Sequence, residues 1–449
     1  IVFSFPIFAK NNQMTNIIRL LHFLLIIAVT SSCVNKSPDQ DYSSIAKLIK
    51  QDSSLIEVHK RAQNLVASGF NAGTVYQEVW IRDFNTFIEV SCDVLPHDLV
   101  KEKLLTFFKF QADDGNIIDG YVPVEQAGVG YKYRYTELAP EFAGHKNTVE
   151  TDQESSLVQA VWKYIQKTKD DSILDEKING LTIVNRLDFA MTYLTDHRLD
   201  EKFGLIWGAT TADWGDVQPE HNWGVELDEN SHICIDIYDN AMFIIALDQL
   251  IEMLTDQKRK EHWSLIKVEI HNNVRIHLWD SVASKFIPHK YIAESPFPLD
   301  FDENIIHFHG GTAIAIEAGL LNKSEIAVVN KQMLANLSAS GAPSIGLTVY
   351  PPYPEGFFKN KSMYPYGYQN GGDWTWFGAR MIRQLANYGF GKEAYEEIQP
   401  MIDRVLINDG FFEWYTLDGK PTGAGKFRGS AGVLATAIEA LWTWAKDYN

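Results

Sequence analysis

Residues 429–445 read GSAGVLATAIEALWTWA and carry the clearest helical pattern of the chain. Their apolar side chains recur along one face of a helix with about 3.6 residues per turn. These side chains are Leu434, Ala435, Ile438, Leu441, Trp442 and Ala445. The stretch therefore predicts a long helix with one face buried against other helices.

The same helical periodicity recurs in eleven further segments. They are residues 41–68, 84–95, 97–112, 151–168, 174–195, 238–255, 258–279, 311–320, 324–338, 374–388 and 391–408. With residues 429–446 they make six consecutive pairs, and the alternation that marks strands is scarce. The sequence therefore predicts an all-α fold.

The connections between these helices alternate between tight turns and long segments. The long segments fall near residues 69–83, 113–150, 196–237, 280–310, 339–373 and 409–428. If consecutive helices run antiparallel, every long segment reaches the same end of the molecule, and long loops in compact domains are usually functional. Because no repeat of fixed period indicates a solenoid, we expect an (α/α)6 toroid of six helical hairpins with its site on one rim.

Local signals mark several helix ends. Thr151 to Glu154 has the spacing of a capping box, and Gly389 is typical of a left-handed helix terminator. Pro400 lies inside the eleventh pattern, where it would kink the helix.

The N-terminal residues predict export. An apolar run, Leu20 to Val29, is short for a membrane span and resembles the core of a signal peptide. It is followed by small residues and Cys33, a pattern similar to a bacterial lipobox whose cysteine is lipidated; an ordinary cleaved signal is the alternative. We therefore expect residues 1–33 to be a signal peptide with lipobox, of which 1–13 could precede the true start at Met14, and residues 34–449 to be one catalytic domain.

This pattern places the protein on the periplasmic face or cell surface of a Gram-negative bacterium, with the lipid anchor as its sole membrane contact. If Cys33 carries lipid, Cys92 and Cys234 remain and permit at most one disulfide, whose formation the sequence leaves open.

Charge and aromatic content restrict the ligand. The net charge of -18 disfavours nucleic acid, which needs a basic surface. Aromatic residues make up 12% of the chain, including twelve Trp, and flat rings with a polar edge suit sugars. We expect a neutral or cationic saccharide, no cofactor and no metal; the oligomeric state stays open.

Two loop segments offer carboxyl groups among aromatic side chains, as glycosidic hydrolysis requires. Asp213 and Asp216 flank Trp214, whose apolar surroundings could raise one carboxyl pKa, although Asp at such turns is often a turn former. Glu413 stands alone among four aromatic residues in the last long loop, in a segment that could also be a short strand with this side chain outward.

Three ordered motifs resemble glycoside hydrolase family 63, and are similar to those of trehalases, glycogen-debranching glucosidases and neutral invertases. They are Trp80-Ile-Arg-Asp83; Trp214-Gly-Asp216 with Ile237-Tyr238-Asp-Asn-Ala241; and Phe412-Glu413-Trp414-Tyr415 with Pro421-Thr-Gly-Ala-Gly425 and Gly429-Ser-Ala431. The resemblance spans residues 75 to 445.

This resemblance implies Asp216 as general acid and Glu413 as general base, and places Arg82 and Asp83 at the sugar in the minus-one subsite. We also expect sugar contacts from four aromatic residues within these motifs, Trp80, Trp214, Tyr238 and Trp414. The chain departs from the family in a shortened linker after Glu413 and in Asp213, which duplicates the acid. The Trp-x-Asp spacing favours Asp216.

Residues 368–376, Tyr-Gln-Asn-Gly-Gly-Asp-Trp-Thr-Trp, form a further candidate binding segment. Gln369 and Asn370 can bracket hydroxyl groups, Trp374 can stack on a ring, and Asp373 completes the set. The segment resembles a sugar-contacting stretch of neutral invertases. Asp83 and Asp373 are alternatively helix caps.

Weaker candidates lie elsewhere on the predicted rim. His307 and His309 have a spacing that suits a metal on a strand but lack a third ligand nearby, so a hydroxyl-binding or packing role is favoured, and Glu303 could join them. Asp119 and Asn147 are either subsite contacts or turn residues.

The motifs together favour an inverting glycoside hydrolase. The resemblance implies an α-linked, gluco-configured oligosaccharide cleaved from its non-reducing end, with carboxyl groups about 6.5–9.5 Å apart. The alternatives are a β-fructofuranosidase of the neutral-invertase type, a non-catalytic glycan-binding lipoprotein, and a lyase or epimerase that uses His307, His309 or Tyr368.

Overall fold

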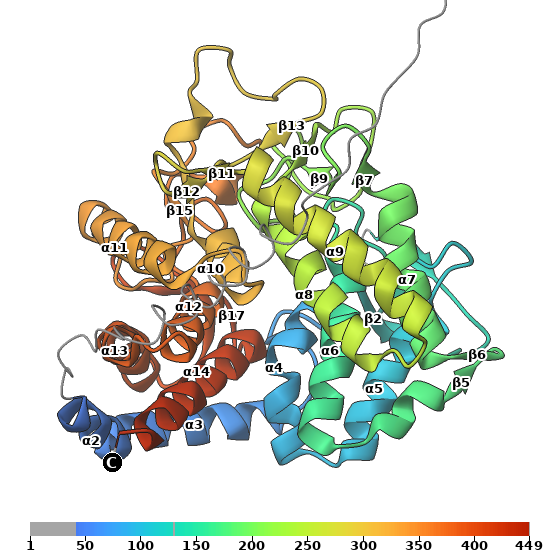
Figure 1. Ribbon diagram of the computed structural model, residues 1–449, viewed down its shortest axis with the longest axis horizontal. Coiled ribbons are helices and arrows are strands. Elements are labelled where there is room, and N and C mark those ends of the chain that lie inside the picture. Colours follow the sequence, from blue (N-terminus) through green and yellow to red (C-terminus); the bar gives the residue numbers. More distant parts are fainter. Residues whose placement is uncertain (1–41, 129–130, 449) are drawn as a thin grey trace, which may run out of the picture. The chain divides into compact units, whose positions relative to one another are not determined.

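The fold is a closed ring of six helices, seen in the computed structural model, which describes residues 42–128 and 131–448 (Figure 1). Each ring helix contacts the next, and the last contacts the first. The ring consists of α4 (Ile81–Val94), α6 (Gln153–Thr168), α8 (Ile237–Met253), α10 (His309–Glu317), α12 (Thr375–Asn387) and α14 (Arg428–Lys446).

Between the ring helices the chain returns through outer helices, so each hairpin pairs one helix of either kind. The outer helices are α3 (Ser53–Val66), α5 (His97–Lys109), α7 (Ile183–His197), α9 (Gln257–His277), α11 (Lys323–Ser340) and α13 (Gly391–Ile407). This arrangement confirms the predicted all-α (α/α)6 toroid.

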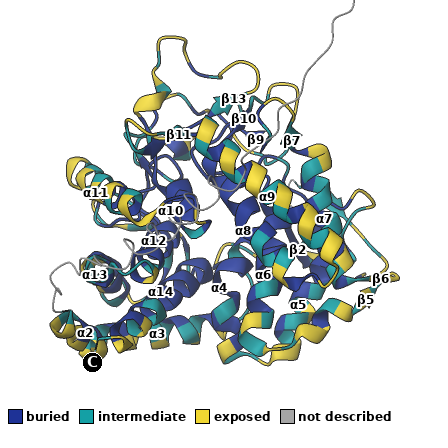
Figure 2. Cartoon of the chain, viewed as in Figure 1, coloured by how far each residue is buried: buried dark blue, intermediate teal, exposed yellow. Residues whose placement is uncertain are grey.

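The ring helices are more deeply buried than the outer helices (Figure 2). Ring helix α10 is buried from His309 through Ile316, because it is covered on every side. Outer helix α9 buries Trp263, Ile270 and Val274 and turns much of its surface to solvent. A helix that is apolar on all sides is usually buried, whereas an amphipathic helix usually lies at the surface. The apolar pattern of α10 and the more polar sequence of α9 therefore match their positions in the inner ring and the outer layer.

Short strands form in the connections between the helices. One sheet has the order β1 (Val79–Trp80), β2 (Gly120–Pro123), β4 (Phe142–His145), β3 (Tyr133–Arg134), and another the order β13 (Lys290–Tyr291), β10 (Ile233–Ile235), β9 (Gly208–Ala209). The two-stranded pairs are β16 (Phe412–Tyr415) with β17 (Pro421–Gly425), β14 (His307–Phe308) with β15 (Val349–Tyr350), β5 (Lys177–Ile178) with β6 (Leu181–Thr182), β7 (Leu199–Asp200) with β8 (Leu205–Ile206), and β11 (Trp279–Asp280) with β12 (Lys285–Phe286). The β5–β6 pair lies between α6 and α7, and the other pairs give the long connections fixed shapes.

Three local predictions were wrong. The helix expected over 41–68 is broken into α2 (Ser43–Gln51) and α3, because the Asp52 side chain caps α3 through the backbone N–H groups of residues 54 and 55. The helix expected from residue 174 begins at Ile183, because Asn179 and Gly180, both at positive φ, turn the β5–β6 hairpin. Asn-Gly is a strong hairpin signal that the apolar periodicity concealed.

The third error is the capping box at Thr151 to Glu154. The Glu154 carboxylate instead accepts from the Ile117 backbone N–H and from Lys146 Nζ, which ties α6 to the preceding connection. Gly389 has φ 82° after α12, as expected of a terminator, and Pro400 lies inside α13.

The chain divides into two units, Ile1–Ser44 and Ile45–Asn449, and the ring lies in the second. The signal segment, the lipobox and Cys33 fall outside the described residues. Within the described ranges no helix has the length and apolar character that a membrane crossing needs. Cys92 and Cys234 are both buried free thiols.

The contact between α14 and α4 tests the closure of the ring. A Cβ at Gly432 would lie 2.4 Å from Phe87 Cβ and 2.5 Å from Phe87 Cα. We expect Gly432→Ala to lower the free energy of unfolding by about 1–3 kcal/mol, the usual cost of overpacking, measured by thermal and urea denaturation. Gly410→Ala is the control, because its Cβ would meet nothing closer than 3.8 Å. Equal unfolding midpoints for the two variants would contradict this account of the closure.

Candidate active site

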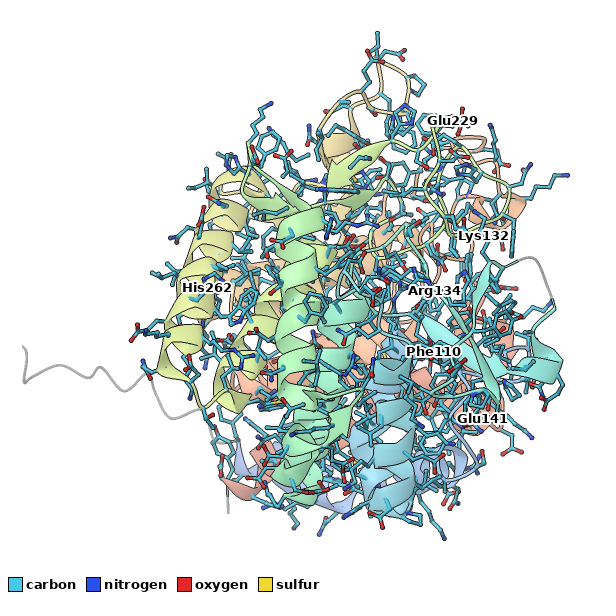
Figure 3. All side chains as sticks on the ribbon, turned by 90° about the vertical axis from the view of Figure 1, so that its right-hand side faces the viewer. Phe110, Lys132, Arg134, Glu141, Glu229 and His262 are labelled. Carbon is cyan, nitrogen blue, oxygen red and sulfur yellow. The ribbon has the colours of Figure 1, made fainter. Side chains whose placement is uncertain are left out.

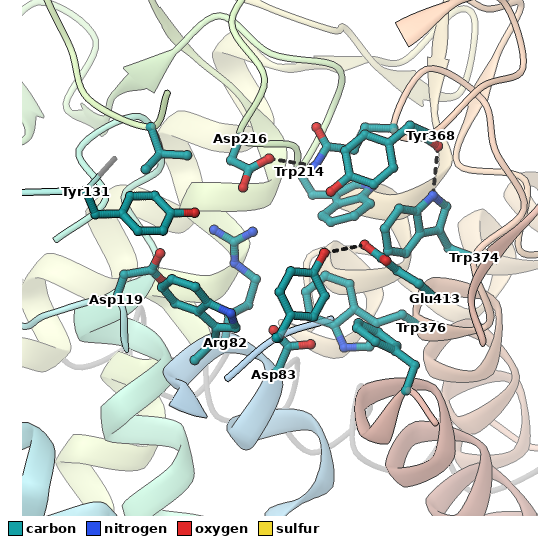
Figure 4. A pocket seen from close by; sticks show the side chains of 15 residues that line it. Arg82, Asp83, Asp119, Tyr131, Trp214, Asp216, Tyr368, Trp374, Trp376 and Glu413 are labelled. Atoms are coloured by element: carbon teal, nitrogen blue, oxygen red, sulfur yellow. Dashed lines mark hydrogen bonds between the residues drawn. The ribbon is translucent and has the colours of Figure 1, made fainter. Parts of the chain in front are cut away.

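A single cavity collects residues from five of the six long connections within the described ranges (Figure 4). About 110 Å³ of it can hold the centre of a water molecule. Its lining consists of Tyr76, Trp80, Arg82, Asp83, Asp119, Tyr131, Trp214, Asp216, Val225, Tyr368, Gln369, Trp374, Trp376, Glu413 and Phe427. The long connections were expected to meet on one rim of the toroid, and residues from five of them do line one cavity.

Glu413 is held firmly in the cavity wall. Tyr76 Oη donates to Oε1 over 3.0 Å, and the Ala424 backbone N–H donates to Oε2 over 2.7 Å. Burial raises the pKa of Glu413, while these two donors act to lower it. Gly423 makes the approach possible, since it has φ 74° and a Cβ there would lie 2.4 Å from Oε2. The β16–β17 hairpin thus fixes one carboxyl group in a defined orientation.

Asp216 enters the cavity from a different connection, the segment between β9 and β10. Its Oδ1 accepts from Gln369 Nε2 over 2.8 Å, and Figure 4 shows its carboxyl group facing the cavity. Gly215 permits this pairing, because a Cβ there would lie 2.4 Å from Gln369 Oε1. Gln369, predicted as a sugar contact, therefore lines the cavity and also orients Asp216.

Arg82 is positioned by buried acids behind the cavity. Its Nε donates to Asp152 Oδ2 over 2.7 Å, and its guanidinium also forms an ion pair with Glu150. Tyr238 Oη donates to the same Asp152 oxygen over 2.8 Å. Tyr238, predicted to contact sugar, is therefore outside the lining and supports the group that holds Arg82.

Asp83 and Asp119 contribute two further carboxyl groups. Among the described residues neither carboxyl group has a hydrogen-bond partner, and both line the cavity. Burial raises the pKa of each to about 7, with Arg82 acting in the opposite direction. Asp83 is not the cap of its helix, because α4 begins at Ile81 and Asp83 lies in the first turn. Both groups are available to a ligand.

Indole rings form one wall. The Trp214 ring meets Trp374 edge to face at 4.6 Å between centroids and Trp376 at 5.1 Å. Trp374 Nε1 donates to the Tyr368 carbonyl over 2.8 Å. The Nε1 groups of Trp214 and Trp376 are buried without a partner within the described part of the chain. Buried N–H groups without a hydrogen-bond partner are rare in native proteins, and the two residues that carry them here line the cavity.

Asp213, the alternative acid, lies outside the cavity. It is 1% exposed, adopts φ 61°, and accepts the Gly311 backbone N–H at the start of α10 on both carboxylate oxygens, each over 2.9 Å. Burial raises its pKa to about 8, against the hydrogen bonds from the glycine backbone. This side chain joins its loop to a ring helix, which the spacing of residues alone did not reveal.

Three more of the predicted sugar contacts, Asn370, Asp373 and Trp414, lie outside the cavity lining. Asn370 Nδ2 donates to the Tyr353 and Met363 carbonyls, and Asn370 Oδ1 accepts from the Tyr353 N–H. Asp373 is not a helix cap, because the cap position is Trp374, and its carboxylate accepts from Arg404 and Ser344. The Trp414 ring is buried behind the lining. Successive side chains of a strand alternate between its faces, so Glu413 faces the cavity and Trp414 does not.

Sequence reasoning missed several lining residues. Tyr76, Tyr131, Trp376 and Phe427 were not singled out, and Asp119 was a weak candidate. Only Asp119 carried a signal, an acid before glycine in a long loop. Tyr76 lies between motifs, so nothing in the sequence indicated its contact with Glu413. His307 and His309 lie apart from this cavity.

Known structures share the fold. A glycoside hydrolase family 63 mannosylglycerate hydrolase from Thermus thermophilus, solved with glucose, is 16% identical, with a TM-score of 0.60 over 86% of this chain and 99% of that one. A rhamnosidase from Klebsiella oxytoca, solved with rhamnose, is 14% identical, with a TM-score of 0.58 over 88% of this chain and 64% of that one. A family 78 rhamnosidase from a Bacillus species is 12% identical, with a TM-score of 0.57 over 86% of this chain and 34% of that one.

These structures are six-hairpin glycosidases, so the predicted resemblance at the level of the fold is confirmed. No family model and no curated protein matches the chain by sequence. At such low identity the likeness establishes the fold alone, and the activity has to be argued from the site.

The raised pKa of Asp119 predicts a pH-dependent stability. The pKa of Asp119 is near 7 in the folded protein and 3.8 ordinarily. The free energy of unfolding therefore falls as the pH rises from 4 to 7, because the unfolded state loses the proton more readily than the folded state. We expect Asp119→Asn to gain roughly 1–4 kcal/mol of unfolding free energy relative to the native protein between pH 4 and pH 8. Denaturant titrations at both pH values measure this, with exposed Asp300→Asn as control. A gain independent of pH would contradict the assignment.

Proposed function

We propose that the protein is an inverting glycoside hydrolase that removes an α-linked, gluco-configured sugar from the non-reducing end of an oligosaccharide. Asp216 protonates the leaving oxygen, and Glu413 takes a proton from the attacking water. The sugar occupies the cavity beside Arg82 and Asp83. The observation that carries this proposal is the entry of two carboxyl groups, from connections far apart in sequence, into one aromatic-walled cavity.

The surroundings of the two carboxyl groups support different roles. Glu413 accepts two hydrogen bonds, which fix its orientation and favour its ionised form, as a base requires. Asp216 accepts one from a neutral amide and keeps its other oxygen for the cavity. A proton carried on that oxygen would reach a glycosidic oxygen bound there. The separation expected for inversion, about 6.5–9.5 Å, leaves room for one water molecule.

The charge in the cavity favours a neutral sugar. Asp83, Asp119, Asp216 and Glu413 surround one guanidinium, that of Arg82, which two acids already neutralise. An anionic ring would face repulsion from several carboxyl groups. The indole rings of Trp214, Trp374 and Trp376 line the cavity and offer apolar faces to a sugar ring.

The proposed setting of this enzyme is outside the cytoplasm, anchored by lipid on Cys33. The motif before Cys33 supports this placement. Metabolic labelling with a clickable palmitate analogue, compared between the native protein and Cys33→Ala, tests it.

Removal of either catalytic carboxyl group should abolish turnover. We expect Asp216→Asn and Glu413→Gln each to lower kcat by about 10²–10⁴-fold, the usual contribution of general acid–base catalysis, with sugar binding largely retained. Steady-state kinetics and calorimetric titration separate these effects. Asp213→Asn is the matched variant: it should lower the thermal unfolding midpoint and spare kcat, and a kcat loss equal to that of Asp216→Asn would reverse the assignment of the acid.

The stereochemistry of the product tests the mechanism. Proton NMR of early products from a panel of α- and β-linked disaccharides, sucrose and mannosylglycerate should show the β-anomer of glucose released from one α-linked substrate. Release of the α-anomer would show retention and exclude Glu413 as the base of a single displacement. Turnover of sucrose alone would favour the β-fructofuranosidase alternative.

A further inference from the structure

A second hollow adjoins the cavity and shares Tyr131 and Val225 with it. About 290 Å³ of it can hold the centre of a water molecule. Its lining consists of Tyr131, Lys132, His145, His221, Trp223, Gly224, Val225, Glu226, Leu227 and Asp228. The proposed catalytic residues are absent from this lining as described, so the hollow extends the site rather than duplicating it.

Trp223 presents a large ring at this hollow. It is 59% exposed, and its ring lies 5.3 Å from that of Tyr131 at an interplanar angle of 36°. Of the indoles that line the cavity, those of Trp214, Trp374 and Trp376 are at most 4% exposed and that of Trp80 is half-buried. An exposed indole beside a cavity offers a flat apolar face to a ligand.

The segment that carries Trp223 is anchored. The Val225 carbonyl accepts from the Thr148 N–H over 2.9 Å, and the Leu227 N–H donates to Thr148 Oγ1 over 2.8 Å. Gln218 Nε2 donates to the Glu226 carbonyl over 3.1 Å. These bonds hold both sides of the segment, so the hollow has a defined shape before any ligand binds.

His145 lines the same hollow as a buried side chain. It is 1% exposed, and both ring nitrogens lack a hydrogen-bond partner among the described residues. Its ring lies 4.1 Å from that of Tyr131. Burial lowers the pKa of His145 to about 4, so the ring is neutral near pH 7 and offers one donor and one acceptor. Hydroxyl groups of a sugar match that combination.

The charged groups of the hollow are already paired. Lys132 forms an ion pair with Glu226, and His221 Nε2 lies 3.0 Å from Asp228 Oδ2. Among its described lining residues no cation is left for a carboxylate or phosphate. An anionic occupant is therefore disfavoured, and a neutral sugar ring meets no such repulsion.

The position of the hollow assigns it to the leaving-group side. Trp223, Val225 and Asp216 belong to one connection, between β9 and β10, whereas Glu413 comes from β16. Figure 4 shows Tyr131 and Glu413 on opposite sides of the cavity. If Asp216 protonates the leaving oxygen, the leaving group extends from Asp216 toward Tyr131 and the hollow beyond.

We infer that Trp223, Tyr131 and His145 form a binding subsite for a neutral sugar ring of the leaving group. The inference rests on the proposed function and makes it more specific: the substrate carries at least one further sugar ring beyond the bond cleaved. Trp223 is a substrate-binding residue and takes no part in proton transfer.

Kinetics on two kinds of substrate test the subsite. α-Glucosyl fluoride has no sugar on its leaving side, whereas maltotriose, isomaltotriose and nigerotriose do. We expect Trp223→Ala to lower the ratio of kcat/KM for the cleaved trisaccharide to that for the fluoride by about tenfold. Trp223→Tyr, which keeps an aromatic face, should restore most of the ratio.

The control is Leu265→Ala on outer helix α9, which removes an exposed apolar side chain elsewhere. In Figure 3 His262 of that helix and Lys132 of the hollow lie toward opposite sides of the view. The ratio should not change in this variant. An unchanged ratio in Trp223→Ala, or an equal fall in both variants, would overturn the subsite.

Calorimetry separates failure of the subsite from failure of the proposed function. If the native protein cleaves none of these substrates, the proposed hydrolysis fails, and the same trisaccharides are titrated against the native protein and Trp223→Ala. Binding weakened by about tenfold in the variant would preserve the subsite in a glycan-binding protein. Equal binding, or none, would overturn it.

Discussion

The closure of the helical ring is the constraint on which the site depends. Gly432 brings α14 against Phe87 of α4, two ring helices from opposite ends of the sequence. The closure also joins the first and last long connections, since the Thr74 N–H donates to the Gly425 carbonyl over 2.9 Å and the Arg428 N–H to the Ala72 carbonyl over 2.8 Å. Tyr76 reaches Glu413 only because these connections lie side by side. Packing between α14 and α4 therefore helps to set the geometry of Glu413, the carboxyl group proposed as general base.

Behind the cavity, the buried charge of Arg82 is compensated by neighbouring acids. Arg82 is bound by Asp152 and Glu150, and Tyr238 adds a hydrogen bond to Asp152. Among the described residues no hydrogen bond reaches the carboxyl group of Asp83 or Asp119, and burial raises the pKa of each to about 7. A site kept partly unsatisfied in this way costs stability, and a polar ligand offsets that cost by supplying the missing hydrogen bonds. The arrangement suits hydroxyl-rich molecules better than charged ones.

In the function proposed above, the cavity and the adjoining hollow together form a binding surface longer than one sugar. The segment between β9 and β10 contributes to both, with Asp216 in the first and Trp223 in the second. A single ordered connection can therefore couple the position of the leaving group to that of the proposed acid. In this scheme Gln369 controls the orientation of Asp216, and Thr148 controls the placement of Trp223.

The sequence by itself determined the helical pairs, the alternation of short and long connections, and the two carboxyl candidates Asp216 and Glu413, because periodicity and motif spacing are local. It misjudged the Asn179-Gly180 hairpin, where a turn signal lay inside an apolar pattern. Only the tertiary structure decided that Asp213, Asn370, Asp373 and Trp414 lie outside the cavity lining, that Tyr238 donates to the acid that holds Arg82, and that Tyr76 and Tyr131 line the cavity. The physical reason is that orientation depends on partners from other connections, such as the Gly311 N–H for Asp213 and Arg404 for Asp373, and no local pattern encodes those partners.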